Sequence, residues 1–179
     1  VMAGIQDERL RVVRPGIVFW WSRYEIHQRW VDGRVVGPDE DAFWAAQERD
    51  LRATIDRLTA TGATLVIAQT ERPGLGMSTR CTAEGCHPLY DLMMNHDEYR
   101  RRWNELVAEV AESDDRVRTF RMDPLLCTDP EPAEPRSPSS CDDLIDGALL
   151  RPDGSHVEPR FGQDVAGRVW EAAITAGSE

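Results

Sequence analysis

The segment “TLVIA” at residues 64–68 is an apolar run of strand length, with a helix-like segment before it and a long polar loop after it. Two further strand-like runs occur, “IVFWW” at residues 17–21 and the shorter “VRTF” at residues 117–120. Strands that are apolar on both faces are typical of a parallel sheet covered on both sides. The chain is therefore expected to contain a three-stranded parallel sheet.

Amphipathic segments alternate with these strands. Apolar residues recur with helical spacing over residues 42–58, and residues 2–13 and a segment beginning near Pro159 show similar patterns. A fourth helix is expected to begin at “NHDE”, where Asn95 is placed to act as the N-cap and Glu98 follows three residues later. This alternation predicts an α/β fold in which helices cover both faces of the sheet.

Each long loop follows a strand and precedes a helix. A polar loop that includes “VDGRVVGPDED” at residues 31–41 follows the first strand, and the loop 69–95 follows the second. The third such loop carries Asp153 and His156. Because ligands bind at the carboxyl ends of the strands in parallel sheets, these loops are expected to form the ligand site.

The composition and the charge restrict the function. The chain has 179 residues, enough for one sizeable core, and a single domain over residues 1–179 is expected. The formal net charge is -11, so a nucleic-acid partner is not expected, because binding to phosphates requires a basic surface. No apolar run is long enough to span a bilayer.

The four cysteines fall into two local pairs in polar loops, Cys81 with Cys86 and Cys127 with Cys141. This arrangement favours two disulfide bonds and an oxidising compartment. Free thiols are the alternative for all four. Cys81, Cys86 and His87 are a possible zinc set with weak zinc spacing, and neither a metal nor another cofactor is expected.

The loop before the last predicted helix reads “LLRPDGSHVEPRFG”, with Asp153 three residues before His156. In a Ser-His-Asp triad, the aspartate orients the histidine and stabilises the imidazolium that forms during attack. The spacing alone is a weak signal in a chain with four histidines and 32 acidic residues. Its place in a glycine-containing loop at the expected ligand edge favours an acid–base pair, with a solvated turn as the alternative.

Several segments resemble those of the SGNH/GDSL hydrolases, most of all the SGNH domains fused to acyltransferase family 3 membrane proteins. “DGSHVEPRFG” (153–162) is similar to their Asp-x-x-His block before the last helix. “RPGIVFWWSRYE” (14–25) and “GATLVIAQTERPG” (62–74) resemble two of their strand segments. The segment that leads to Asp153 and contains Cys127 and Cys141 is also similar to theirs. The resemblance covers about residues 14–175.

The resemblance implies a flavodoxin-like three-layer α/β/α sandwich and ester hydrolysis or O-acyl transfer on acylated cell-surface carbohydrate. It makes His156 the general base and Asp153 its orienting acid, and it makes Ser22 and Arg23 candidates for the oxyanion hole or for substrate binding. The implied partners are an acylated carbohydrate or small ester and an integral-membrane acyltransferase domain in the parent chain. The implied location is extracytoplasmic, on the periplasmic or cell-surface side, with a membrane tether before residue 1.

The family’s Gly-Asp-Ser block, which carries the nucleophile, has no counterpart in the 179 residues. The chain is therefore expected to be the C-terminal portion of an SGNH-like domain that lacks the first strands of the sheet. Ser22 is the best alternative nucleophile within the chain, because it follows an apolar strand. A non-catalytic carbohydrate- or protein-binding remnant of the fold is the alternative function.

The other basic residues show no catalytic pattern. Arg72, Arg80 and Arg100–Arg102 are expected to be solvated rather than to clamp a substrate. His27 and His87 are expected in exposed loops.

Overall fold

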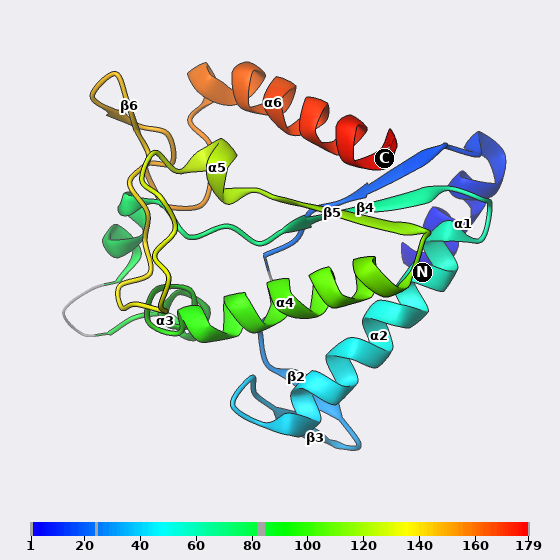
Figure 1. The fold of residues 1–179 in the computed structure, drawn as a ribbon. Coiled ribbons are helices and arrows are strands. Elements are labelled where there is room, and N and C mark those ends of the chain that lie inside the picture. Colours follow the sequence, from blue (N-terminus) through cyan, green and yellow to red (C-terminus); the bar gives the residue numbers. More distant parts are fainter. Residues whose placement is uncertain (1, 24, 82–84, 179) are drawn as a thin grey trace. The chain divides into compact units, whose positions relative to one another are not determined.

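The computed structural model describes residues 2–23, 25–81 and 85–178 (Figure 1). These residues form two compact units. The first comprises the chain up to Ala68, Glu105–Phe120 and the residues from Ala172 onward, and the second comprises Gln69–Asn104 and Arg121–Glu171. No helix in the described ranges is both long and apolar enough to cross a bilayer.

A three-stranded parallel sheet lies at the centre of the first unit. Its strand order is β1 (Ile17–Trp20), β4 (Thr64–Gln69), β5 (Val117–Arg121). Residues Leu65–Ala68 of the central strand are all buried, as expected for a strand with apolar side chains on both faces. All three strands lie where the sequence predicts them.

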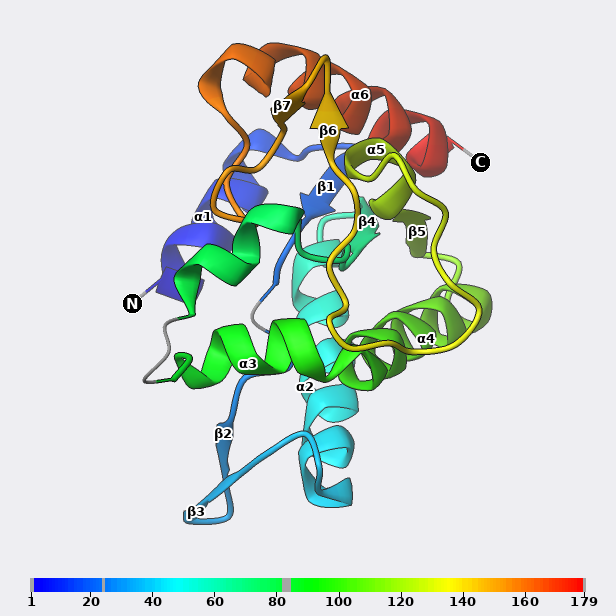
Figure 2. The ribbon, with the colours of Figure 1, turned by 90° about the vertical axis from the view of Figure 1, so that its left-hand side faces the viewer.

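Helices cover both faces of this sheet (Figures 1 and 2). α2 (Asp41–Thr59) and the last turns of α4 (Asp97–Ser113) lie on one face, and the end of α6 (Pro159–Ser178) lies on the other. The end of α6 packs through two alanines against Val66 of β4. The predicted α/β/α sandwich with a parallel sheet is thus confirmed.

β1 forms an edge of the sheet among the described strands. The carbonyl of Gly16 accepts a hydrogen bond from β4. Because backbone groups alternate in direction along a strand, the N–H and C=O groups of Ile17 and Phe19 point away from β4. A cavity of about 650 Å³ runs along this edge, lined by α1 (Met2–Val13), α2 and the consecutive residues Val18–Trp21.

The segment after β1, expected to be a polar loop, contains a β-hairpin. β2 (Arg29–Val31) pairs antiparallel with β3 (Arg34–Val36). The turn residues Asp32 and Gly33 have φ angles of 50° and 83°. A two-residue hairpin turn of type I′ requires positive φ at both positions, which Asp-Gly adopts readily, so the hairpin has a local cause.

The second unit contains mostly short elements (Figure 2). They are the 3₁₀ helix η1 (Leu75–Arg80), α3 (Pro88–Asn95), α5 (Asp123–Leu126) and the antiparallel strands β6 (Leu144–Ile145) and β7 (Ala148–Leu149).

Two of these elements correct the sequence-based expectations. η1 and α3 occupy the range 69–95, which was expected to be a loop. Asn95 ends α3 instead of capping α4, and its side chain donates a hydrogen bond to Asp91 within α3. The predicted capping box is therefore wrong, because a separate helix already occupies the residues before α4.

Candidate functional site

Asp153 and His156 lie together in the loop between β7 and α6, as the sequence predicts. Nδ1 of the His156 ring lies 2.7 Å from Oδ2 of Asp153. The other carboxylate oxygen, Oδ1, accepts hydrogen bonds from the backbone N–H groups of Ser155 at 2.9 Å and of His156 at 2.7 Å. The imidazole side chain is 79% exposed, so a reacting group can reach it from solvent.

The glycine between these residues explains the shape of the loop. Gly154 has a φ angle of 76°, in the left-handed region that glycine adopts without strain. Its carbonyl accepts a hydrogen bond from the N–H of Gly74 at 2.9 Å. A Cβ at position 154 would lie 2.3 Å from the backbone nitrogen of Met77, so only glycine lets the loop pack directly on η1.

Arg80, at the end of η1, contacts the same aspartate. Its Nη2 bonds to Oδ2 of Asp153, and its Nε donates to the Asp153 carbonyl at 3.0 Å. Its Nη1 donates to the hydroxyl of Tyr90 at 2.7 Å, and its Nη2 lies 3.4 Å from Nδ1 of His156. The expectation that Arg80 is solvated is wrong, because this side chain is 25% exposed and ion-paired.

These contacts keep the Asp153 carboxylate ionised. Burial raises the pKa of Asp153, but hydrogen bonds from the His156 backbone and ring, from the Ser155 N–H and from Arg80 lower that pKa by more. The resulting pKa lies well below the usual range of an aspartate. The carboxylate therefore carries its charge throughout the neutral pH range, as the orienting acid of a triad must.

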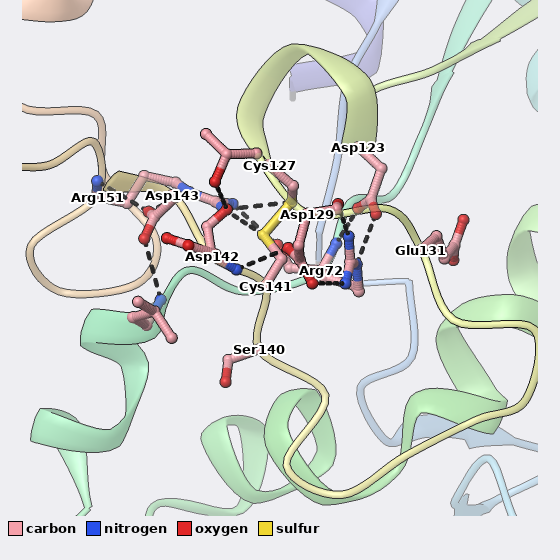
Figure 3. Close-up of a disulfide and its surroundings, with 12 residues drawn as sticks. Arg72, Asp123, Cys127, Asp129, Glu131, Ser140, Cys141, Asp142, Asp143 and Arg151 are labelled. Carbon is pink, nitrogen blue, oxygen red and sulfur yellow. Dashed lines mark hydrogen bonds and ion pairs between the residues drawn. A yellow bond between two sulfur atoms is a disulfide. The ribbon is translucent and has the colours of Figure 1, made fainter. Parts of the chain in front are cut away.

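A fully buried ion pair holds the start of this loop, where Arg151 lies two residues before Asp153. The side chains of Arg151 and Asp143 have no exposed surface, and Nε of Arg151 lies 3.1 Å from Oδ2 of Asp143. Nη1 of Arg151 donates to the carbonyl of Arg72 at 2.9 Å, and its Nη2 lies 3.0 Å from Sγ of Cys141 (Figure 3). The pair thus connects the start of the loop to the segments around Arg72 and Cys141 in the second unit.

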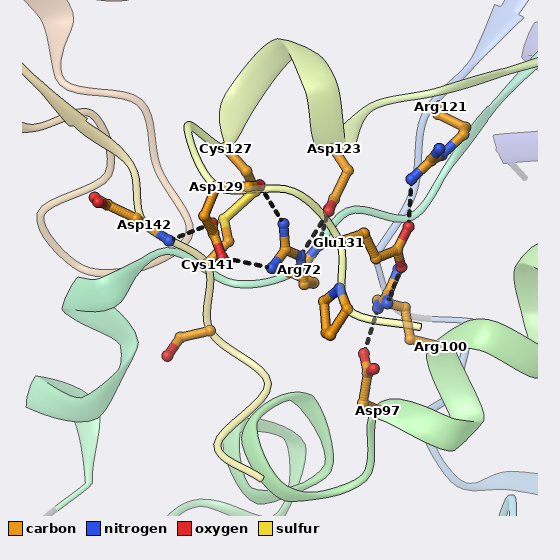
Figure 4. A network of polar contacts seen from close by, with 12 residues as sticks. Arg72, Asp97, Arg100, Arg121, Asp123, Cys127, Asp129, Glu131, Cys141 and Asp142 are labelled. Carbon is orange, nitrogen blue, oxygen red and sulfur yellow. Dashed lines mark hydrogen bonds and ion pairs between the residues drawn. A yellow bond between two sulfur atoms is a disulfide. The ribbon is translucent and has the colours of Figure 1, made fainter. Parts of the chain in front are cut away.

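Arg72 is also fully buried, so the expectation that it is solvated is wrong. Its Nε donates to Oδ2 of Asp123 at 2.6 Å, and its Nη1 donates to Oδ2 of Asp129 at 3.1 Å (Figure 4). A buried arginine requires such partners, because an unpaired charge in the interior is costly. The partners lie more than 50 residues away in the sequence, where no local pattern reveals them.

Arg100 belongs to the same kind of network. It is 5% exposed and donates to Asp97 at 2.7 Å and to Glu131 at 2.5 Å (Figure 4). Arg101 is half-buried and also donates to Asp97, at 2.8 Å. Only Arg102 of this run is exposed as expected.

Both predicted disulfides form, one between Cys81 and Cys86 and one between Cys127 and Cys141. Disulfide bonds are typical of oxidising compartments outside the cytosol. The zinc alternative is wrong, because the Cys81 and Cys86 sulfurs bond to each other and His87 caps α3. Among the residues that the structure describes, no three His, Cys, Asp or Glu side chains gather as a metal site requires.

Ser22 and Arg23 belong to the first unit and follow β1 directly. Both residues are half-buried, and Tyr24 of the same segment lies outside the described residues. Nε2 of Gln47 donates to the carbonyl of Glu25 at 2.8 Å and to its carboxylate at 2.9 Å, which anchors the segment on α2. The segment thus begins at the carboxyl end of a strand, as predicted, in a different unit from the acid–base pair.

The arrangement in the second unit is suited to proton transfer. With Nδ1 hydrogen-bonded to Asp153, Nε2 of His156 is the nitrogen that can take a proton from a hydroxyl group. Asp153 then stabilises the positive charge that develops on the ring. Arg80 and Tyr90 complete this site, and the sequence carries no signal that joins them to it.

Comparisons of the chain with protein-family models, with curated protein sequences and with solved structures find no match. The resemblance to the SGNH hydrolases therefore stays a prediction from sequence motifs.

Proposed function

We propose that the chain is part of an SGNH-type esterase or O-acyltransferase in which Asp153 and His156 form the acid–base half of a Ser-His-Asp triad. The observation that carries this proposal is the 2.7 Å contact between His156 Nδ1 and the ionised Asp153 carboxylate. The exposure of the ring and the motif “DGSHVEPRFG” support it.

In the proposed reaction, Nε2 of His156 takes the proton of a serine hydroxyl as the serine oxygen bonds to the ester carbonyl carbon. Collapse of the tetrahedral intermediate breaks the bond to the leaving alcohol, which receives the proton from Nε2. Water or a carbohydrate hydroxyl then accepts the acyl group from the serine, with His156 again acting as the base. Asp153 keeps Nδ1 protonated and offsets the charge on the ring throughout.

The proposed serine lies outside the 179 residues, because no Gly-Asp-Ser block occurs among them. Ser22 is the alternative within the chain. The proposed substrate is an acylated cell-surface carbohydrate, and the proposed partner is an integral-membrane acyltransferase domain of the parent chain. The proposed location is the periplasmic or cell-surface side of a membrane, with which the two disulfides agree.

The test measures hydrolysis of 4-nitrophenyl acetate and release of acetate from an acetylated oligosaccharide by the natural polypeptide that contains this chain. His156→Ala and Asp153→Asn are each expected to lower kcat by at least about 10³-fold. His27→Ala is the matched control, because His27 is an exposed histidine of the first unit, and it should leave kcat unchanged.

Wild-type rates in His156→Ala would contradict the proposal. Oligosaccharide binding without hydrolysis, unaffected by His156→Ala, would favour the non-catalytic alternative. Loss of activity in both Ser22→Ala and His156→Ala would assign the nucleophile to Ser22.

A further inference from the structure

We propose that the open edge of β1 binds an extended peptide segment of a partner protein, which adds to the sheet as a further strand and brings an acidic residue to Arg9. This inference concerns the first unit and goes beyond the proposed function, which concerns the second unit. Three features carry it: the outward backbone groups of β1, the cavity along them and the basic residue at one end of that cavity.

The backbone of β1 offers hydrogen-bonding groups to a further strand. The N–H and C=O groups of Ile17 and Phe19 point away from β4, and no described strand pairs with β1 on that side. Natural edge strands are commonly protected from pairing by charged side chains or proline. The sequence of β1, Ile-Val-Phe-Trp, contains neither. An extended peptide can bond to these groups, because its own backbone carries the matching donors and acceptors.

The cavity of about 650 Å³ lies along the edge where such a strand would run, and all of its lining residues belong to the first unit. Its lining includes the consecutive residues Val18–Trp20, whose side chains alternate between the two faces of the sheet, so the cavity reaches the edge itself. Phe19 and Trp21 are 37% and 42% exposed. Leu10 and Val13 of α1 also line the cavity. These apolar side chains can pack against alternate side chains of an added strand.

One end of the cavity is basic. Arg9 lines it about one helical turn before Val13, on the same face of α1. Arg57 of α2 lies near this turn of α1, where its Nη1 donates to Gln6 at 3.1 Å and pairs with Asp7 at 3.2 Å. Asp7 thus offsets the charge of Arg57, whereas Arg9 is exposed and takes part in no ion pair among the contacts of the described residues. Arg9 can therefore pair with an acidic side chain of the added strand.

The same features disfavour two other occupants. An acyl chain would cover the backbone groups of Ile17 and Phe19 without bonding to them, and buried polar groups without partners are costly. A second copy that paired through β1 would bring no acidic residue, because Ile17–Trp20 contains none. Self-association at this edge should therefore be weaker than binding of the proposed segment.

The test selects ligands for the immobilised chain from a phage-displayed library of random ten-residue peptides. We expect the selected peptides to share alternating apolar residues and one acidic residue. Fluorescence anisotropy with synthetic copies of these peptides then measures their affinity for the chain in solution.

N-methylation of single backbone nitrogens in a selected peptide tests backbone pairing without changing the chain. Because N–H groups alternate in direction along a strand, methylation at every second position should remove a hydrogen bond to β1. It should lower the affinity about tenfold. Methylation at the positions between should have little effect, and these peptides are the matched controls.

Arg9→Gln tests the charge pair. It is expected to lower the affinity of an acidic peptide about two- to fivefold, the effect of one exposed ion pair. It should not change the affinity of the same peptide with its acid replaced by the amide. Arg11→Gln is the matched control, because Arg11 is an exposed arginine of the same helix that pairs with Glu8 and lies outside the cavity lining.

A library that yields no binding peptide would overturn the inference. Equal effects of methylation at all positions, or equal effects of Arg9→Gln and Arg11→Gln, would overturn it as well. A stable dimer of the chain at micromolar concentration that Phe19→Pro disrupts would assign the edge to a second copy instead.

Discussion

Nη2 of Arg151 lies 3.0 Å from Sγ of Cys141, in a part of the second unit where the arginine side chain has no exposed surface. The buried ion pair with Asp143 and the disulfide to Cys127 therefore form one cluster (Figure 3). Because Arg151 lies in the same loop as the acid–base pair, two residues before Asp153, the stability of the second unit and the geometry of the candidate site depend on the same contacts.

Arg151→Met is expected to lower the free energy of unfolding by about 3–5 kcal/mol, because it leaves the Asp143 charge buried without its partner. The double variant Arg151→Met with Asp143→Leu should cost less than the sum of the single changes, because no buried charge is left unpaired. Urea unfolding followed by tryptophan fluorescence measures both effects. Arg52→Gln, in an exposed pair, should cost less than about 1 kcal/mol, and additive costs at Arg151 and Asp143 would contradict the ion-pair explanation.

Removing the Cys127–Cys141 disulfide by a double Cys→Ser change is expected to cost about 3 kcal/mol, because the bond closes a loop of about 15 residues. Its ends are 14 positions apart in the sequence. The Cys81–Cys86 bond, with a separation of 5, is the matched comparison, and its removal should cost only about 2 kcal/mol in the same treatment. Thermal and urea unfolding of the two variants test this order, and the reverse order would refute the loop-entropy explanation.

Acid is expected to destabilise the second unit. Four of its carboxyl groups have lowered pKa values, because hydrogen bonds and nearby arginines outweigh the opposing effect of burial; they are Asp97, Asp129, Glu131 and Asp153. Such groups bind protons more readily in the unfolded chain. Their contribution to the free energy of unfolding is therefore complete above the pKa values of the unfolded chain, near pH 4, and it is lost as the pH falls through the pKa values of the folded chain.

The free energy of unfolding should therefore decrease steadily as the pH is lowered from about 4 to about 2. Above about pH 5, these four groups should change it little. Urea unfolding at a series of pH values measures this slope. Asp97→Asn should make the acid slope shallower, because it removes one titrating group. A slope identical to that of the wild type would show that Asp97 contributes nothing.

The open edge of β1 is expected to promote association at high protein concentration, because an edge strand offers unpaired backbone groups to another chain. Phe19→Pro should reduce this association relative to Phe19→Ala. The N–H of residue 19 points away from β4, so proline at this position loses no hydrogen bond of the sheet. Sedimentation velocity over a range of concentrations measures the effect.

Val18→Pro is the control for this experiment, because the N–H of residue 18 points toward β4. It should lower the free energy of unfolding by about 1–3 kcal/mol beyond the loss of the side chain. A wild-type chain that stays monomeric at every concentration would contradict the prediction.

Local patterns were sufficient for most of the first unit. The strand runs 64–68 and 117–120 and the helical segment 42–58 match β4, β5 and α2 to within one residue at each end, because hydrophobic periodicity is a property of neighbouring residues. Hydrophobic periodicity does not predict the hairpins β2–β3 and β6–β7, although Asp32-Gly33 and Asp146-Gly147 carry a turn signal that locates both.

The sequence by itself determined that Asp153 and His156 lie three positions apart with a glycine between them, so that they can meet within one turn. Only the tertiary structure decided the charge environment of that pair. A local sequence pattern gives an arginine the appearance of a solvated residue. The carboxylates that pair with Arg72 and Arg80, however, lie 51 to 73 residues further along the chain. Burial and ion pairing depend on which distant segments the fold brings into contact, and no local periodicity encodes that.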